Sequence, residues 1–323
     1  MPGDQPLDSA PMTTALITHP DCLGHVNPPG HPERVERLQA IAAALEGEEF
    51  AYLVRVEAPL AEDTQILRAH PAGYLASLAE RLPERSFAAL DADTFLCPGS
   101  LAAARRAAGA VVQGVDMVMA GEVRNAFCAV RPPGHHAETE TPMGFCLLGN
   151  AVIGARHALE AHGLARVAIV DFDVHHGNGT QDLVWNDARI LFASTQQMPL
   201  YPGTGAASER GAHGQIVNVP LPPGAGGAEF RAAFGAKVLP ALEAHAPELV
   251  VISAGFDAHH RDPLANLNLR EADFAWATAE ICALADRHAA GRVVSTLEGG
   301  YDLGALAASV AAHVRVLMER GHG

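Results

Sequence analysis

The segment VAIVDFDVHHGNGT, residues 167–180, decides the fold of this chain. It opens with four apolar residues, which is typical of a parallel strand that is buried on both faces. Asp171, Asp173 and His175 then alternate, and alternate side chains of an extended segment point to the same face. The segment therefore predicts a buried strand whose carboxyl end presents a carboxylate and an imidazole to a single point.

Similar apolar runs recur along the 323 residues and alternate with alanine- and leucine-rich segments of helical periodicity. The expected strands are Ala15–Thr18, Tyr52–Val56, Ala126–Val130, Val167–Asp171, Ile190–Ser194, Ile216–Val219, Leu249–Ser253 and Val293–Leu297. The expected helices are Glu33–Leu45, Leu101–Ala120, Ala151–His162, Glu229–His245, Glu271–His288 and Leu303–Arg320. This alternation predicts an α/β fold with a central, mostly parallel sheet and helices on both faces.

Composition narrows the class of protein. Because no repeat or break in composition divides the chain, we expect one catalytic domain over residues 13–323, after a disordered tail at residues 1–12. The formal net charge of −15 argues against nucleic acid and membranes as partners. No apolar run reaches the length of about 18 residues that a membrane span needs. The five cysteines form no C-x-x-C pair, so we expect neither disulfides nor a thiolate zinc site, and a cytoplasmic location.

Polar residues directly follow four of the apolar runs. The four continuations are RPPGHH from Arg131, DFDVHH from Asp171, AGFD ending at Asp257, and EGGY ending at Tyr301. In open parallel sheets, ligands bind outside the carboxyl ends of the strands. We therefore expect these groups to converge on one rim of the sheet.

Three of these residues have the character of metal ligands. Asp173 and His175 share one strand end, and Asp257 leaves another. Three protein ligands with a vacant fourth position describe a catalytic zinc site, although iron(II) or cobalt suits the same ligands. The alternative is that the acids cap helices or form turns. We expect Asp171 to orient a neighbouring histidine or, with Ser194, to help bind a monovalent cation.

Three further residues suit proton transfer. His135 and His136 follow a Pro-Pro-Gly turn, and a neutral histidine beside a metal-bound water is the usual general base. Asp171 and Asn178 are the natural partners for the far ring nitrogens of this pair. Tyr301, after two glycines, is placed to donate a hydrogen bond to a developing oxyanion. Together these groups predict metal-assisted hydrolysis of an amide.

The motifs resemble those of the histone deacetylase superfamily, which includes acetylpolyamine amidohydrolases and bacterial deacetylase-like amidohydrolases. HPERVERL, RPPGHHAE, GFC, DFDVHHGNGT, YPGTG, SAGFDAHHRDPL and LEGGYD follow one another in the family's order. Asn178 stands where class I members carry an aspartate, so the chain looks closer to class II. The resemblance implies the arginase-deacetylase fold, with a sheet of about eight parallel strands.

The resemblance also implies roles for single residues. It implies zinc on Asp173, His175 and Asp257, and a structural potassium ion near Asp171 and Ser194. The implied catalytic residues are His136 as general base and acid, His135 as its electrostatic partner, and Tyr301 as the oxyanion donor. The implied substrate contacts are Gly144, Phe145 and Tyr201 in the wall of a narrow acyl-lysine tunnel, Leu264 beside it, and Asp93 at the rim. Arg34 is implied to line an internal channel for acetate release.

Leu264 bears on the substrate. Polyamine-specific relatives carry a glutamate after the Asp-Pro pair, whereas leucine offers no charge to a second amine. We therefore favour an acylated lysine peptide as substrate, with acetylpolyamines or other small amides as the alternative. Tyr301 argues against a catalytically silent acyl-lysine binding module. Gly177 and His259, where the related arginases carry further metal ligands, argue against a two-manganese ureohydrolase. No pattern specifies an oligomeric state.

Overall fold

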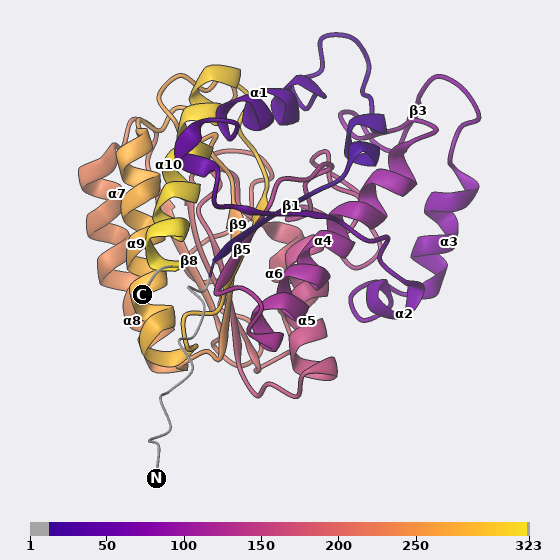
Figure 1. Ribbon diagram of the computed structural model, residues 1–323. Helices are drawn as coiled ribbons and strands as arrows, with labels where there is room; N and C mark the ends of the chain where they lie inside the picture. The colour runs from indigo at the N-terminus through magenta and orange to yellow at the C-terminus, as the bar shows by residue number, and fades with distance from the viewer. Residues whose placement is uncertain (1–12, 322–323) are drawn as a thin grey trace.

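The computed structural model describes residues 13–321, and its centre is an eight-stranded sheet in which every neighbouring pair runs parallel (Figure 1). The strand order is β2-β1-β5-β10-β9-β6-β7-β8. The strands are β1 (Thr14–Thr18), β2 (Val54–Glu57), β5 (Asn125–Cys128), β6 (Val167–Asp171), β7 (Ile190–Gln197), β8 (Ile216–Leu221), β9 (Leu249–Ala254) and β10 (Val293–Leu297). The predicted parallel sheet is confirmed, whereas the expected tail at residues 1–12 lies outside the described residues.

The middle of the sheet is apolar on both faces. Strands β5, β10, β9 and β6 are buried at every position, because helices exclude water from both sides of them. The edge strand β2 is mostly exposed and carries Arg55 and Glu57. Charged side chains at an edge discourage pairing with other chains.

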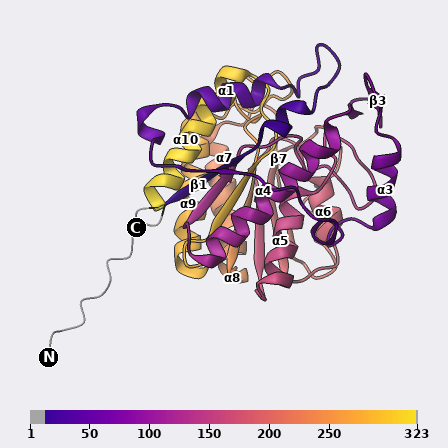
Figure 2. The same cartoon turned by 45° about the vertical axis from the view of Figure 1, so that its right-hand side comes forward.

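Helices cover both faces of the sheet (Figures 1 and 2). One face is covered by α4 (Ser100–Ala120), α5 (Asn150–Ala161) and α6 (Asn178–Val184), with α2 (Asp63–Ile66) and α3 (Ala72–Glu80) at the periphery. The other is covered by α7 (Gly227–Ala233), α8 (Leu239–His245), α9 (Glu271–His288) and α10 (Leu303–Gly321), with α1 (Glu36–Ala44) against α10. No helix within residues 13–321 combines the length and apolar character that crossing a bilayer requires.

The structure refines several predicted elements. The helix expected over Glu229–His245 contains a π-helical turn at Phe234–Val238, just before Pro240, which has no N–H for the regular helical hydrogen bond. Helices α2, α3 and α6 and the small hairpin of β3 (Ala88–Ala89) and β4 (Phe95–Leu96) were not predicted. α2, α6 and the hairpin strands are too short for a periodic apolar pattern to develop, whereas α3 has apolar residues at helical spacing that the prediction missed.

Aromatic packing beneath the strand ends orients the polar residues above it. Phe172 and Phe256 each precede an aspartate, are fully buried, and have ring centroids 5.8 Å apart. Because successive side chains of an extended segment point to opposite faces, this packing directs Asp173 and Asp257 the other way.

Candidate active site

The site lies where four neighbouring strands end. Strands β5, β10, β9 and β6 are adjacent in the sheet, so the residues that follow them meet at one rim. This places Asp173 and His175 after β6, Asp257 after β9 and Tyr301 after β10. The expected convergence therefore follows from the strand order.

We call Asp173, His175 and Asp257 the strand-end group. The Nδ1 atom of His175 lies 3.2 Å from Asp173 Oδ1 and 3.0 Å from Asp257 Oδ2. All three residues are buried, and their ligand atoms lie within 4.8 Å of one another. Three atoms that can each coordinate a metal ion thus lie around one point.

Glycines let the backbone approach these carboxylates closely. A Cβ atom on Gly255 would lie 2.0 Å from Asp173 Oδ2, and one on Gly299 would lie 2.1 Å from Asp257 Oδ2. The N–H of Gly299 instead donates to Asp173 Oδ2 at 2.8 Å. A side chain at either position would push the carboxylates apart.

The electrostatics of the strand-end group suit a cation. Within residues 13–321, the ion-pair partners of Asp173 and Asp257 are histidines, so two buried carboxylates lack an arginine or lysine. Burial lowers the pKa of His175, but these carboxylates outweigh it and raise the pKa to about 10. Because buried charge is costly without compensation, the group fits a divalent ion such as zinc.

Two histidines lie beside the strand-end group, each with a fixed partner. His135 Nδ1 lies 2.9 Å from Asp171 Oδ2, and His136 Nδ1 lies 2.7 Å from Asn178 Oδ1. The Asn178 amide donates to Glu138 Oε1 at 2.8 Å, which orients its oxygen toward His136. His136 therefore carries its proton on Nδ1, and its Nε2 is left as an acceptor.

The two histidines have opposite protonation tendencies. Burial would lower the pKa of His135, but the carboxylates of Asp173 and Asp171 raise it well above its usual value. Burial and the neighbouring charge of His135 hold the pKa of His136 well below its usual value. One ring is thus poised as a cation and the other as a neutral base, with ring centroids 4.0 Å apart.

Tyr301 lines the cavity that also reaches His136 and His175, and it enters from the β10 side. Its N–H donates to Asp262 Oδ2 at 2.7 Å, and the Arg37 guanidinium lies 5.0 Å from its ring centroid. Burial raises the pKa of Tyr301 well above its usual value, although Arg37 acts in the opposite direction. The phenol therefore keeps its proton and is a hydrogen-bond donor.

A cavity of about 360 Å³ leads to these groups. Phe145 stands edge-on to Tyr301 with ring centroids 5.9 Å apart, and Tyr201 stands edge-on to His136 at 5.3 Å. Gly144 has φ 55°, and a Cβ there would lie 2.4 Å from a ring carbon of His136. The cavity is lined by His31, Pro32, Ala92, Asp93, Phe95, His136, Gly144, Phe145, His175, Leu200, Tyr201, Leu264 and Tyr301.

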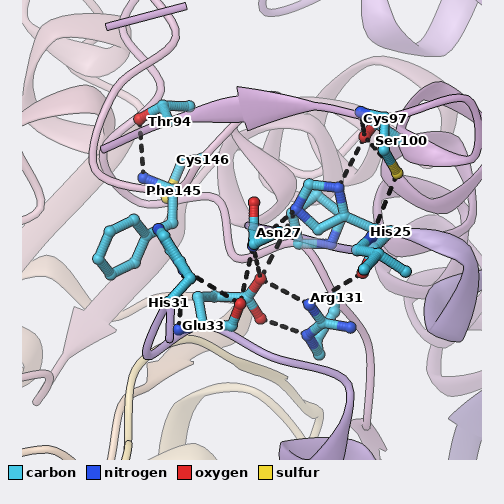
Figure 3. Close-up of polar contacts among 12 residues, drawn as sticks. His25, Asn27, His31, Glu33, Thr94, Cys97, Ser100, Arg131, Phe145 and Cys146 are labelled. Atoms are coloured by element: carbon cyan, nitrogen blue, oxygen red, sulfur yellow. Dashed lines mark hydrogen bonds and ion pairs between the residues drawn. The ribbon is translucent and has the colours of Figure 1, made fainter. Parts of the chain in front are cut away.

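A buried polar network supports the wall of this cavity (Figure 3). Glu33 accepts two hydrogen bonds from Arg131 and one from Asn27, and neither charged side chain is exposed. His31 accepts from the Glu33 N–H at 3.1 Å, donates to the Asp93 carbonyl at 2.9 Å, and packs edge-on against Phe145 at 4.7 Å. The network thus connects the loop at residues 25–34 to the rim and the cavity wall.

Comparison with known proteins agrees with this geometry. A family model described as the histone deacetylase domain matches residues 31–317. The chain belongs to the histone deacetylase family. It is 38% identical to a probable deacetylase of Archaeoglobus fulgidus, covering 90% of this chain and 82% of that protein. It is 39% identical to a histone deacetylase-like amidohydrolase of Pseudomonas aeruginosa, covering 86% and 75%.

A solved structure extends the comparison to the fold. The crystal structure of the HDA15 HD domain matches with a TM-score of 0.91 at 35% identity, covering 96% of this chain and 89% of that one. The arginase-deacetylase fold expected from the motifs is thereby confirmed. Membership of the family makes the chain a hydrolase of the deacetylase and amidohydrolase type.

The structure places the expected potassium residues side by side. Asp171 and Ser194 are paired in the register of β6 and β7, and both are buried. The Ser194 hydroxyl donates to Gln196 Oε1 at 2.9 Å, and Asp171 Oδ1 accepts from the Asp173 N–H. Their part in holding a monovalent cation stays a prediction.

The expected part of Arg34 in an internal channel stays a prediction. Arg34 precedes α1, has an exposed side chain, and lines a second pocket that shares Leu264 and Tyr301 with the cavity. The buried arginine is Arg37, which donates to the Gly300 carbonyl at 2.7 Å behind Tyr301. The two arginines stand in one motif, and only the start of the helix decides which of them turns inward.

Glu298 is a site residue that the sequence-based assignment left without a role. It is fully buried and accepts from the N–H groups of Gly134 and His135, at 2.7 and 3.1 Å. Burial raises its pKa to about 7. It therefore ties the loop after β5 to the loop after β10. The signal was its place in the Glu298-Gly-Gly-Tyr301 motif, directly after an apolar strand.

Proposed function

We propose that this family member hydrolyses the amide of acylated lysine side chains, with zinc held by Asp173, His175 and Asp257. The observation that carries the proposal is the convergence of this strand-end group with a neutral histidine and a protonated tyrosine at the end of one cavity. Bound zinc would polarise the acyl carbonyl and make water more acidic.

His136 is the residue that moves the proton. Its Nδ1–H is held by Asn178, so its Nε2 accepts a proton from the attacking water. The same nitrogen then returns a proton to the departing lysine amine. His135, held by Asp171, contributes positive charge beside the developing negative charge.

Tyr301 stabilises the oxyanion in this proposal. Its phenol is protonated and faces the same cavity as His136 and His175. The hydrogen bond strengthens as the carbonyl oxygen gains charge, so it lowers the barrier rather than only binding the substrate. Asp262 and Arg37 hold the backbone and ring of Tyr301 in place.

The cavity walls suit an aliphatic stem that ends in an amide. Phe145, Tyr201 and Leu264 offer apolar surface along the passage, and Asp93 stands half-buried at the mouth. Leu264 brings no charge for a second amine, which favours acyl-lysine over acetylpolyamine. Asp93, which lines the cavity, and the net charge of −15 favour the alternative of a cationic small amide.

A substrate panel tests the proposal. Zinc-loaded protein would be assayed on acetyl-lysine peptides, acetylpolyamines and acetyl anilides, with Asp257→Ala as the inactive control. We expect the highest kcat/KM on the peptides, and Leu264→Glu should shift preference toward acetylpolyamines. Hydrolysis of none of these amides by the zinc-loaded protein would contradict the proposed function.

The potassium ion and the location belong to the same proposal. We place potassium beside Asp171 and Ser194, where a dependence of melting temperature on potassium but not lithium would support it. The cytoplasmic location stays a prediction, since a relative in Arabidopsis thaliana is named chloroplastic.

A further inference from the structure

A second cluster of histidine and aspartate side chains lies on the helices, away from the strand ends. Within residues 13–321 it is the only other group whose ligand atoms meet as those of the strand-end group do. Asp116 Oδ1, on α4, lies 2.7 Å from Nε2 of His157, on α5, and 2.7 Å from Nε2 of His162, which directly follows α5. We call these three residues the helix group.

We propose that the helix group binds a divalent transition metal of the zinc type and joins α4 to α5. Two imidazole nitrogens and one carboxylate oxygen suit Zn²⁺, Co²⁺ or Ni²⁺, with water completing the coordination. Magnesium and calcium prefer sites built from oxygen atoms and are excluded. Asp116 Oδ1 lies 2.7 Å from each imidazole nitrogen, and it must move away from each by about 0.6 Å to reach the separation of roughly 3.3 Å that ligand atoms have around a tetrahedral ion with bonds of about 2.0–2.1 Å.

The helix group is accessible but partly fixed in place. The side chain of His157 is 8% exposed, whereas those of His162 and Asp116 are 26% and 43% exposed. The buried histidine therefore holds its position against α4, and the other two ligands form the open side of the site. An ion reaches them from solvent without any opening of the fold.

The site is remote from the chemistry. α5 begins at Asn150, whose side-chain amide donates to the Pro132 carbonyl beside the active-site histidines. His162 stands 12 residues further along, which corresponds to roughly 18 Å of helix. A metal here takes no part in amide hydrolysis and acts on the stability of the α4–α5 pair, whose helices pack against each other.

Arg68 competes with the metal. Its Nη1 lies 2.7 Å from His157 Nδ1, and because arginine only donates, Nδ1 is the acceptor. His157 therefore carries its proton on Nε2, the atom that must bind the metal. On binding, that proton leaves Nε2 and Nδ1 gains one from solvent. Arg68 then gives up this hydrogen bond and keeps its ion pair with Glu160.

Metal stoichiometry tests the proposal. Full-length protein would be equilibrated with excess Zn²⁺, separated from free ion by gel filtration, and measured by elemental analysis. We expect two equivalents in the wild type, one in His162→Ala and one in Asp257→Ala. His288→Ala, which removes a partly exposed histidine paired with Glu243, should keep both. The proposal would be overturned if the wild type bound one equivalent of zinc and Asp257→Ala bound none. The helix group would then be a set of hydrogen-bonded side chains that binds no metal.

Arg68→Ala gives a second readout with the opposite sign. Removing the competing donor should tighten Zn²⁺ binding at the helix group severalfold, measured by calorimetry on protein already holding one equivalent. Weaker or unchanged binding in this variant would contradict the competition. If Asp257→Ala kept two equivalents of zinc while His162→Ala lost one, the result would contradict the zinc site proposed at the strand-end group. It would still support the metal site proposed at the helix group.

Discussion

The strand-end group and the helix group contain the same kinds of residue but differ in what surrounds them. Both combine two residue types, aspartate and histidine, with ligand atoms that meet at one point. The strand-end group is buried at the end of the cavity, and within residues 13–321 the ion-pair partners of its carboxylates are histidines. The helix group is partly exposed, and Arg68 donates a hydrogen bond to Nδ1 of His157, the ring nitrogen that does not face Asp116.

This difference in burial is the reason why we propose the strand-end group, and not the helix group, as the site of hydrolysis. Burial removes most of the solvation of the two carboxylates of the strand-end group, and no lysine or arginine pairs with them within residues 13–321, so a bound cation would offset a large cost. The helix group is partly exposed and one of its histidines already accepts from Arg68, so we expect the protein to fold without a metal there.

Asp257→Ala should abolish turnover and remove the strand-end metal. The variant leaves one carboxylate and one imidazole, which is too few ligands for a catalytic zinc site. Activity assays and elemental analysis would measure both effects, with Asp116→Ala as the matched control. Full turnover in Asp257→Ala, or its loss in Asp116→Ala, would reverse the roles of the two groups.

Tyr301→Phe should retain zinc and lower kcat by about 10² to 10³, the usual cost of removing one oxyanion donor. The ring keeps its packing against Phe145, so KM should change little. Steady-state kinetics on an acetyl-lysine peptide would measure this. A kcat near that of the wild type would remove Tyr301 from the chemistry.

Asn178→Asp should move the acid limb of the pH–rate profile. The base must be unprotonated, and burial with the charge of His135 lowers the pKa of His136. Wild-type kcat/KM should therefore persist below pH 6.5 and fall only as the pH drops through that lowered pKa. A carboxylate at residue 178 favours the protonated ring, so the limb should rise by about 1 to 3 pH units. If the acid limb stays at the same pH in Asn178→Asp, its cause is the protonation of a group other than His136.

His162→Ala should have the smallest effect. We expect unchanged kcat/KM and loss of only the part of the zinc-induced rise in melting temperature that the helix group contributes, because an ion that binds only the native state stabilises it by mass action. Calorimetric scans of wild type and variant with and without Zn²⁺ would measure this. A change in kcat/KM would connect the helix group to the active site.

The parallel sheet and most residues of the candidate site could be predicted from the sequence. Apolar runs buried on both faces specify strands, and the residues directly after them fall on one rim because parallel strands end at the same edge. Short spacing also paired Asp173 with His175. These inferences need only local periodicity and the rule that ligands bind at strand ends.

Contacts between distant segments could not be predicted from the sequence. Asp116 lies 41 and 46 residues from its histidine partners, and no local pattern joins them. The inward turn of Arg37 rather than Arg34 depended on where α1 begins against the loop that carries Tyr301. Such contacts depend on how the helices pack on the sheet, and the spacing of residues along one strand or helix does not predict that packing.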